Sequence, residues 1–313
     1  MNSVTRRLLE RWHAAPQRSD APARPERPEA LPPGTRLGGM RIAQPIGRGA
    51  SAVVYAAVDE ASDRAVAVKV LCPPRQGDNP QADNEVHNRF LRDAERASRL
   101  VHPGIVRLYG GGCQRGVSFA VMELLTGSPL TRHTQAPHLL PEPLAVGLVA
   151  RLAAALAYAH RAGVVHRDVK PANVMFDPAT DSVKLTDFGL SRNVDDEATR
   201  SGLLLGSPAY MAPELLAGGR ADARSDLYAL GVVLFELLTG QLPFAGESMG
   251  ALLRAIATQA PRTVRELRPE LPAGVAMALD NALEPALARA RLDRPDDGDA
   301  WAAALRRVAT LLA

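Results

Sequence analysis

The sequence predicts an α+β fold in which a small β-rich part with one helix precedes a larger, mainly helical part. Between Arg36 and Tyr109, apolar residues alternate in short runs, as in strands with one buried face. One helical pattern interrupts these runs at 84–100. After Glu123 the apolar residues recur mostly at helical spacing. Strands followed by helices are typical of an α+β plan rather than of alternating βαβ units.

Each part contains recognisable elements. In the first part, strands are expected at 53–55 and 65–71, where Val and other β-forming residues gather. In the second part, short β pieces are expected between Val164 and Thr186. The periodicity predicts helices over the ranges 143–161, 223–238, 249–258, 275–287 and 299–311.

These patterns suggest three segments. Residues 1–35 are expected to be an N-terminal tail or linker that is partly disordered, because 16–33 is rich in Pro, Arg, Ala and Glu and nearly lacks large apolar residues. Residues 36–124 form the β-rich part and 125–313 the helical part. No internal repeat is visible.

Composition excludes several classes of protein. With 313 residues, 46% of them hydrophobic, the chain can bury a substantial core, which excludes a disordered or fibrous protein. The net charge is +3 with both signs interspersed, so no nucleic-acid partner is expected. The two cysteines, Cys72 and Cys113, are too few for a disulfide framework or a cysteine metal cluster.

The apolar runs also argue against membrane insertion. The longest ones, near 144–158 and 227–238, contain Arg151 and Glu236. The first residues lack the apolar core and small-residue cleavage site of a secretory signal. A cytoplasmic location is therefore expected.

A glycine-rich turn occurs at 46–54, between two β-like runs. Glycines allow the backbone to approach phosphates closely and to point N–H groups at them. A dinucleotide-binding fingerprint would need a helix directly after the glycines, whereas 53–58 continues as a strand. Read alone, the turn is equally well a simple hairpin. Ala52 stands where a third glycine is usual.

Lys69 ends an apolar alternation and shares a face with Ala67 rather than with the neighbouring valines. Taken alone, a lysine on a strand usually faces solvent. Two later segments are far more specific. They read His166-Arg167-Asp168-Val169-Lys170-Pro171-Ala172-Asn173 and Asp187-Phe188-Gly189.

With these segments the chain resembles the eukaryotic-like protein kinase family, in its bacterial serine/threonine branch. The resemblance extends over nearly the whole chain after Arg36 and implies the two-lobed kinase fold: a small β-rich N-lobe with one main helix and a larger helical C-lobe. Further matches are Gly47, Gly49, Val54, the 122–123 hinge, the 206–214 segment, Asp226 and Arg294.

The resemblance implies an ATP- and Mg²⁺-dependent serine/threonine protein kinase, with Mn²⁺ as an alternative ion. Asp168 would orient the substrate hydroxyl and accept its proton, and Lys170 would neutralise the transferring phosphate. Lys69 would bind the α- and β-phosphates, while Asn173 and Asp187 would hold the metal. The implied ATP-binding positions are Ile46, Gly47, Arg48, Gly49, Ala50, Ser51, Val54, Ala67, Lys69, Met122, Glu123, Leu125 and Met175.

The resemblance also implies structural and regulatory residues. Glu214 and Arg294 correspond to an ion pair that ties the activation segment to the helical lobe, and Asp226 is likewise structural. Arg167 corresponds to an arginine that captures a phosphate on the activation segment. That segment offers Thr199 and Ser201 as sites of autophosphorylation.

One position departs from the family pattern. The helix of the N-lobe usually carries a glutamate that pairs with the strand lysine, and the alignment puts Asp93 there. Aspartate is shorter by one methylene. Glu95 lies about 200° around the helix and could substitute only after a register shift.

This departure and Ala52 support a pseudokinase, an ATP-binding interaction module, as the alternative function. A small-molecule phosphotransferase is a further alternative, which the peptide-docking segment at 206–214 disfavours. The expected partners are protein substrates, with self-association through the N-lobe as a further expectation and with neither nucleic acid nor membrane insertion.

Overall fold

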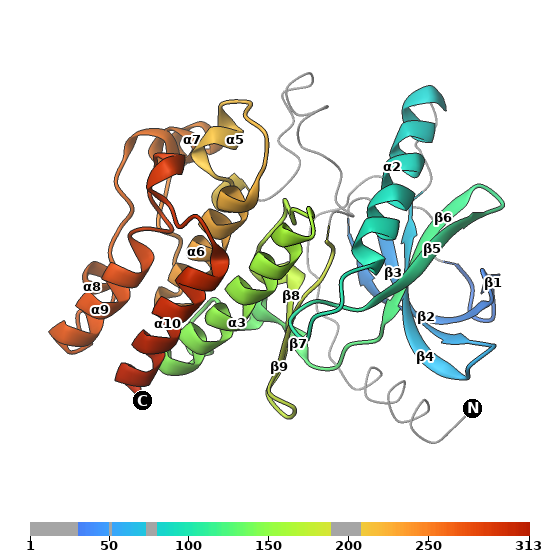
Figure 1. The fold of residues 1–313 in the computed structure, drawn as a ribbon, viewed down its shortest axis with the longest axis horizontal. Coiled ribbons are helices and arrows are strands. Elements are labelled where there is room, and N and C mark those ends of the chain that lie inside the picture. The colour runs from blue at the N-terminus through green and yellow to red at the C-terminus, as the bar shows by residue number, and fades with distance from the viewer. Residues whose placement is uncertain (1–30, 50–51, 73–79, 189–207) are drawn as a thin grey trace. The chain divides into compact units, whose positions relative to one another are not determined.

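The computed structural model describes residues 31–49, 52–72, 80–188 and 208–313 (Figure 1). The chain divides into two compact units. The first comprises residues up to Val101 together with Val106–Thr126, and the second comprises His102–Ile105 together with Gly127–Ala313. Most of the predicted tail at 1–35 lies outside the described residues, as do the candidate residues Ala50, Ser51, Thr199 and Ser201.

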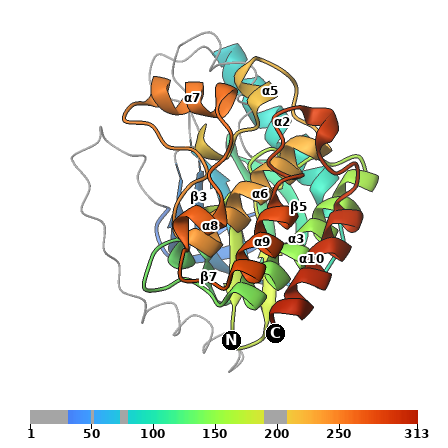
Figure 2. The same cartoon turned by 90° about the vertical axis from the view of Figure 1, so that its left-hand side faces the viewer.

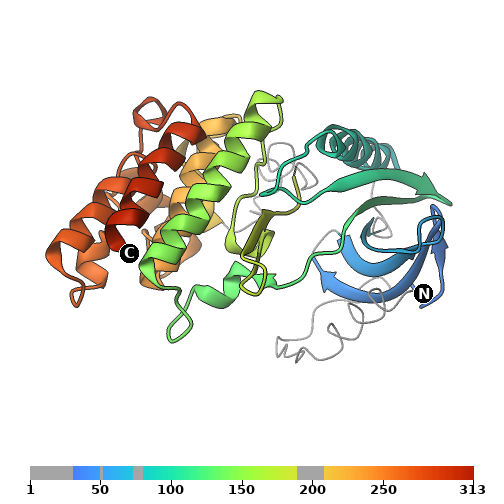
Figure 3. The same cartoon turned by 60° about the horizontal axis from the view of Figure 1, so that its bottom comes forward.

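The first unit is built on a six-stranded sheet in the order β1-β2-β3-β4-β6-β5, in which all neighbours are antiparallel. The sheet curls strongly (Figure 3). Its strands are β1 (Arg36–Leu37), β2 (Met40–Arg48), β3 (Ala52–Asp59), β4 (Arg64–Leu71), β5 (Leu108–Gln114) and β6 (Val117–Glu123).

One face of this sheet carries an apolar core. Alternate β4 residues Val66, Val68 and Val70 pack there with Tyr55 and Phe119. The curl brings the turn between β1 and β2 onto Phe119. A Cβ at Gly38 would lie 2.2 Å from the ring, and its φ of +58° is left-handed, so this position needs glycine.

Helix α2 (Pro80–Ser98) packs against β5 and β6. His87 Nδ1 lies 2.7 Å from Ser118 Oγ on β6. Ser118 alternates with the core residue Phe119, so α2 covers the face opposite the apolar core. The helix confirms the element predicted at 84–100, beginning four residues earlier.

The second unit is mainly helical in the part that the structure describes. Its core helices are α3 (Glu142–Arg161) and α6 (Ala223–Thr239), and α10 (Gly298–Leu312) lies along α3 (Figure 2). A Cβ at Gly298 would lie 2.5 Å from the Ala153 carbonyl oxygen, so glycine permits this close approach. The other α-helices among its described residues are α5 (Pro213–Leu216), α7 (Met249–Thr258), α8 (Val264–Leu267) and α9 (Ala273–Leu283).

Short strands and single turns complete this unit. The strands β7 (Ser128–Pro129), β8 (Val174–Asp177) and β9 (Ser182–Leu185) form a small antiparallel sheet. The 3₁₀ turns are Leu130–His133, Pro171–Asn173, Pro208–Tyr210 and Arg291–Asp293.

Helix α6 is buried along nearly its whole length, which explains its continuous apolar sequence. It begins at a capping box, in which the Asp222 side chain accepts from the Ser225 N–H and the Ser225 side chain bonds the Asp222 backbone. It ends at Gly240, whose φ of 71° is left-handed. The predicted end of α9 at 287 was wrong: the helix ends at Leu283, because Pro285 has no N–H to continue it.

Helix α3 is the one described helix long and apolar enough to cross a membrane. However, 61% of that stretch is buried inside the structure, where α3 packs against α6 and α10. A buried core helix passes the same length and hydropathy test, so this helix is weak evidence for a membrane span.

Candidate active site

In the first unit, the glycine-rich turn joins β2 to β3. Gly47 pairs with Val54 across the two strands, and the Gly49 N–H donates to the Ala52 carbonyl oxygen at 2.9 Å. A strand follows the glycines, as predicted, so the geometry is not that of a dinucleotide-binding turn. The predicted ATP-binding residues Ile46 and Arg48 lie in the last part of β2.

Four of the predicted ATP-binding residues share one face of the sheet. Val54 lies opposite Lys69 in the β3–β4 pair, and Ala67 lies opposite Met122 in the β4–β6 pair. Directly paired residues point to the same face, and Ala67 and Lys69 are two residues apart. Lys69 is only 7% exposed, so it does not face solvent as an ordinary strand lysine would.

The same face is the one that α2 covers, and α2 carries Asp93. The Asp93 side chain is 14% exposed and lies 3.9 Å from Arg96. The Glu95 side chain is 69% exposed and forms a 2.9 Å ion pair with Arg99. Of the two carboxylates, that of Asp93 is therefore the less exposed one. At the end of β6, the Glu123 N–H donates to the Arg107 carbonyl oxygen, and Leu125 follows half-buried.

In the second unit, three predicted catalytic residues come together in the loop after α3. Lys170 Nζ lies 2.9 and 2.8 Å from the two carboxylate oxygens of Asp168. Asn173 Nδ2 donates to the backbone and side-chain oxygens of Asp168, at 2.8 Å each. The Asp168 carboxylate is thus held by a cation and an amide while its side chain stays 28% exposed. It is fixed in place yet accessible.

These contacts also orient Asn173 for metal binding. Because its amide nitrogen bonds Asp168, its side-chain oxygen is turned the other way, and hard oxygen atoms are the ligands that Mg²⁺ prefers. The Asn173 carbonyl oxygen accepts from the Thr186 N–H at 2.8 Å, which ties the loop to the segment that carries Asp187. Among the described residues no cluster of three His, Cys, Asp or Glu could hold a metal alone. The side-chain oxygens of Asn173 and Asp187 would fit an ion that a nucleotide's phosphates also bind.

Asp226, in the first turn of α6, anchors this loop through hydrogen bonds. Its two carboxylate oxygens accept from the N–H groups of His166 and Arg167, each at 2.8 Å. His160 Nε2 lies 2.8 Å from the same carboxylate. Arg167 has a φ of 70°, a strained conformation for a non-glycine residue, and the hydrogen bond from its N–H to Asp226 compensates for it.

His166 is fully buried, and both of its ring nitrogens have partners. Nε2 lies 2.9 Å from the Thr186 carbonyl oxygen, so it carries the proton, and Nδ1 accepts from the Asp168 N–H at 3.3 Å. The ring packs 4.5 Å from that of Phe188. This geometry gives His166 a packing role, and Asp168 stays the predicted base.

Comparison with known proteins decides the family. Residues 40–285 match the protein kinase domain. The chain belongs to the protein kinase domain family. The predicted α+β architecture is therefore the two-lobed protein kinase fold, and the first and second units are its N-lobe and C-lobe.

The curated relatives are bacterial. The chain is 38% identical over 245 residues to the serine/threonine-protein kinase PrkC of Bacillus subtilis, covering 77% of this chain and 37% of PrkC. It is 41% identical over 261 residues to the DNA damage-responsive serine/threonine-protein kinase RqkA of Deinococcus radiodurans, covering 80% and 37%. It is 36% identical over 270 residues to the serine/threonine-protein kinase PknL of Mycobacterium tuberculosis, covering 86% and 65%.

These relatives confirm the predicted bacterial serine/threonine branch. The chain spans only 37% to 65% of their lengths. Each relative therefore extends beyond the part that this chain matches.

An ion pair joins α5 to the segment between α9 and α10. Arg294 donates from Nη1 and Nη2 to the two carboxylate oxygens of Glu214, at 2.7 Å each. The Arg294 side chain is fully buried, and its guanidinium lies 4.8 Å from the centre of the Tyr228 ring. Since Glu214 directly follows the segment at 208–213, the pair fixes that segment to Arg294, which packs on Tyr228 of α6.

Sequence reasoning missed a second polar contact near this segment. The Tyr210 hydroxyl donates to Glu236 Oε2 on α6 at 2.6 Å. Burial raises the pKa of the Glu236 carboxyl, and the hydrogen bond from Tyr210 only partly offsets this. Burial and the nearby carboxylate raise the pKa of Tyr210 as well, so its hydroxyl stays protonated. The sequence carries no signal for this contact, because the pattern of an apolar helix predicts that its glutamate lies on the surface.

Proposed function

We propose that this chain is a serine/threonine protein kinase that transfers the γ-phosphoryl group of ATP to serine or threonine hydroxyls of other proteins. The observation that carries the proposal is the Asp168 carboxylate, held by Lys170 and Asn173 and still accessible. Phosphoryl transfer depends on positioning and on neutralising charge, and this cluster supplies both.

The C-lobe residues have separate roles in the reaction. The substrate hydroxyl oxygen forms a bond to the γ-phosphorus, the bond from that phosphorus to the β-γ bridging oxygen breaks, and ADP leaves. Asp168 orients the hydroxyl and accepts its proton. Lys170, within hydrogen-bond distance of Asp168, stabilises the charge on the transferring group.

Metal binding would fall to Asn173 and Asp187 through their side-chain oxygens. The bound ion would neutralise phosphate charge. We propose Mg²⁺ as the ion, with Mn²⁺ as the alternative that the same oxygen ligands accept. Asp187 has a φ of 63°, and Thr186 before it is bonded to Asn173, so both ligands belong to one connected segment.

The predicted ATP-binding residues come from both lobes. In the N-lobe, Lys69 would pair with the α- and β-phosphates, and the turn at 46–51 would bring backbone N–H groups to them. Val54, Ala67 and, in the C-lobe, Met175 would contact adenine. The backbone from Glu123 to Leu125 would supply its hydrogen bonds, with Met122 limiting the depth of the pocket. The relatives' names give no support to the pseudokinase alternative.

The test is transfer of labelled phosphate from ATP and Mg²⁺ to a generic protein substrate and to the chain itself. Asp168→Asn removes the base and should abolish transfer while ATP binding is retained. Asp181→Asn is the matched control, since Asp181 is 73% exposed and asparagine tolerates its φ of 49°. Transfer by Asp168→Asn at the wild-type rate would refute the assignment. ATP binding without transfer in the wild type would instead support a pseudokinase.

We propose further that phosphorylation of Thr199 or Ser201 activates the kinase through Arg167. The exposed Arg167 directly precedes Asp168, so a phosphate that pairs with it would order the activation segment beside the base. Mass spectrometry of ATP-treated protein should find phosphate at one of the two positions. Arg167→Gln should then lower the activity of the phosphorylated form alone.

The expected location and partners are proposals of the same kind. Protein substrates follow from the kinase chemistry, and a cytoplasmic location and self-association through the N-lobe remain expectations. Sedimentation of the chain over a range of concentrations tests self-association directly.

A further inference from the structure

Arg107 lies directly before β5 and contacts two other parts of the N-lobe. Its Nη1 donates to the carbonyl oxygens of Ser98 and Leu100, at 2.8 Å each. Its backbone N–H donates to Glu123 Oε1 at 2.6 Å, and its carbonyl oxygen accepts from the Glu123 N–H at 2.9 Å. Since Ser98 ends α2 and Glu123 ends β6, one half-buried residue joins these two elements.

The guanidinium of Arg107 closes the C-terminal end of α2. The last carbonyl groups of a helix have no partner within the helix, and they carry a partial negative charge that favours a cation. Arg107 supplies both the hydrogen-bond donors and the positive charge. Because Arg107 belongs to the segment that continues into β5 and not to α2, these bonds fix the end of the helix to the sheet.

The contact between α2 and β5 is made partly by small residues. A Cβ added at Gly111 of β5 would lie 3.4 Å from the Cβ of Ala94 on α2. Side chains this small form no interlocking ridges and grooves, so they do not fix the position of the helix along the strand. Hydrogen bonds fix it instead, because His87 holds the first half of α2 and Arg107 holds its end. Asp93 lies between these two bonds.

The backbone of Arg107 also restrains Glu123, where the segment proposed to bind adenine begins. The N–H and the carboxylate of Glu123 are both bonded to Arg107. A residue held at two points keeps one backbone direction, and a hydrogen bond to adenine depends on that direction. The Glu123 side chain therefore restrains the start of the segment at 123–125.

We propose that Arg107 is a positioning residue for ATP, which couples the position of α2 on the sheet to the backbone that binds adenine. The inference rests on the proposed function, because it takes the backbone at Glu123 as a point of ATP binding. The guanidinium and the backbone belong to one residue, so a shift of α2 moves Glu123. Coupling between two sites is reciprocal, so a bound nucleotide in turn restrains the end of α2.

The test uses ADP with Mg²⁺, which carries the adenine and the α- and β-phosphates but does not turn over. Calorimetry gives the Kd for ADP of the full chain and of three variants. Arg107→Met removes the guanidinium and keeps the apolar stem, and Arg107→Lys keeps the charge and a donor. Arg99→Met is the matched control, since it removes the same charge at the same helix end, where the exposed Arg99 pairs with the exposed Glu95. Hydrogen exchange at residues 95–100, with and without ADP, reports on the end of α2.

In the wild type, ADP is expected to slow hydrogen exchange at residues 95–100. Arg107→Met should raise the Kd for ADP by about tenfold and abolish this slowing, because it removes two hydrogen bonds from a charged donor. Arg107→Lys should restore most of the affinity, and Arg99→Met should leave it unchanged.

A role confined to capping α2 predicts a different result. Exchange in Arg107→Met would then be faster to the same extent with and without ADP, at an unchanged Kd, and this result would overturn the proposal. Wild-type exchange that does not respond to bound ADP would overturn it as well, in a measurement that needs no variant. A wild-type chain that binds no ADP would refute the proposed function together with this inference.

Discussion

The Glu214–Arg294 pair allows a quantitative test of what burial does to an ion pair. All five N–H groups of Arg294 face acceptors: two face Glu214, and three face the carbonyl oxygens of Arg224, Ala288 and Arg289. The Arg294 side chain is fully buried and that of Glu214 is 20% exposed. Glu214→Gln keeps the shape but removes the anion, so a buried guanidinium loses its counter-charge.

Removing one partner of a buried pair costs about 3–5 kcal/mol. Because Glu214 keeps some exposure, the lower value, about 3 kcal/mol, is the expected loss of unfolding free energy. For a domain of this size that loss lowers Tm by about 6–12 °C. The matched control is Asp181→Asn, which breaks a pair with Arg151 of the same two-bond geometry but with side chains 40% and 73% exposed. Its expected cost is about 0.2–1 kcal/mol.

Trp301 provides the assay. It is buried in α10, where its indole N–H donates to the Ala282 carbonyl oxygen, so its fluorescence reports unfolding of the C-lobe. The only other tryptophan is Trp12, which Trp12→Phe removes from every variant. Thermal scans would then compare Glu214→Gln with Asp181→Asn. Equal losses of Tm in the two variants would refute the argument that burial makes the Glu214 pair indispensable.

Three further predictions concern single side chains. Tyr228→Phe removes a buried hydroxyl that has no partner among the described residues, so urea unfolding should show unchanged or slightly raised stability, by up to about 1 kcal/mol, and a clear loss would contradict this. Burial raises the pKa of Glu236 above its ordinary value of 4.5, so the folded state holds the carboxyl proton more tightly than the unfolded state does. The contribution of this group to the unfolding free energy therefore falls as pH rises past 4.5. Glu236→Gln, which keeps an acceptor for Tyr210, should therefore flatten the fall in unfolding free energy between pH 4.5 and neutral pH, and equal slopes would count against it. Asp93→Ala should raise KM for ATP or lower kcat by at least about tenfold, with Asp93→Glu retaining activity and Glu95→Ala, on the exposed side of α2, as the control.

The fold was predictable because its periodic signals are strong. The valine alternation of β4 and the continuous apolar stretch of α6 both reflect the surfaces that these elements bury. The strand β5 was harder to predict, since Gly110, Gly111 and Gly112 carry no side-chain pattern. Boundaries failed where a local backbone effect decided them, as Pro285 does after α9.

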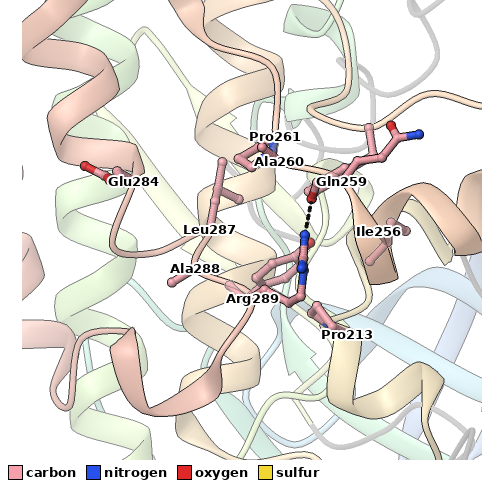
Figure 4. A pocket seen from close by; sticks show the side chains of 11 residues that line it. Pro213, Ile256, Gln259, Ala260, Pro261, Glu284, Leu287, Ala288 and Arg289 are labelled. Atoms are coloured by element: carbon pink, nitrogen blue, oxygen red, sulfur yellow. Dashed lines mark hydrogen bonds between the residues drawn. The ribbon is translucent and has the colours of Figure 1, made fainter.

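The candidate site was predictable only in part. Asp168, Lys170 and Asn173 lie within six residues, so their proximity follows from the sequence. The hydrogen bonds of Asp226 with His160 and His166 could not be predicted from the sequence, because these residues are 60 or more positions apart. A cavity in the C-lobe, lined by Pro213, Tyr228 and Leu287 (Figure 4), left no motif in the sequence, because its lining residues come from segments far apart in the chain.

The long-range hydrogen bonds to Asp226 have a consequence for synthesis on the ribosome. The His166 N–H donates to a residue 60 positions later in the chain, and Glu214 pairs with Arg294, which is 80 positions later. At about 5–20 residues per second, Asp226 is made about 3–12 s after the loop that it supports. A nascent chain that already contains Asp168, Lys170 and Asn173 therefore has no anchored catalytic loop. Phosphoryl transfer is therefore expected to begin only after α6 has been made and Asp226 has bonded to this loop.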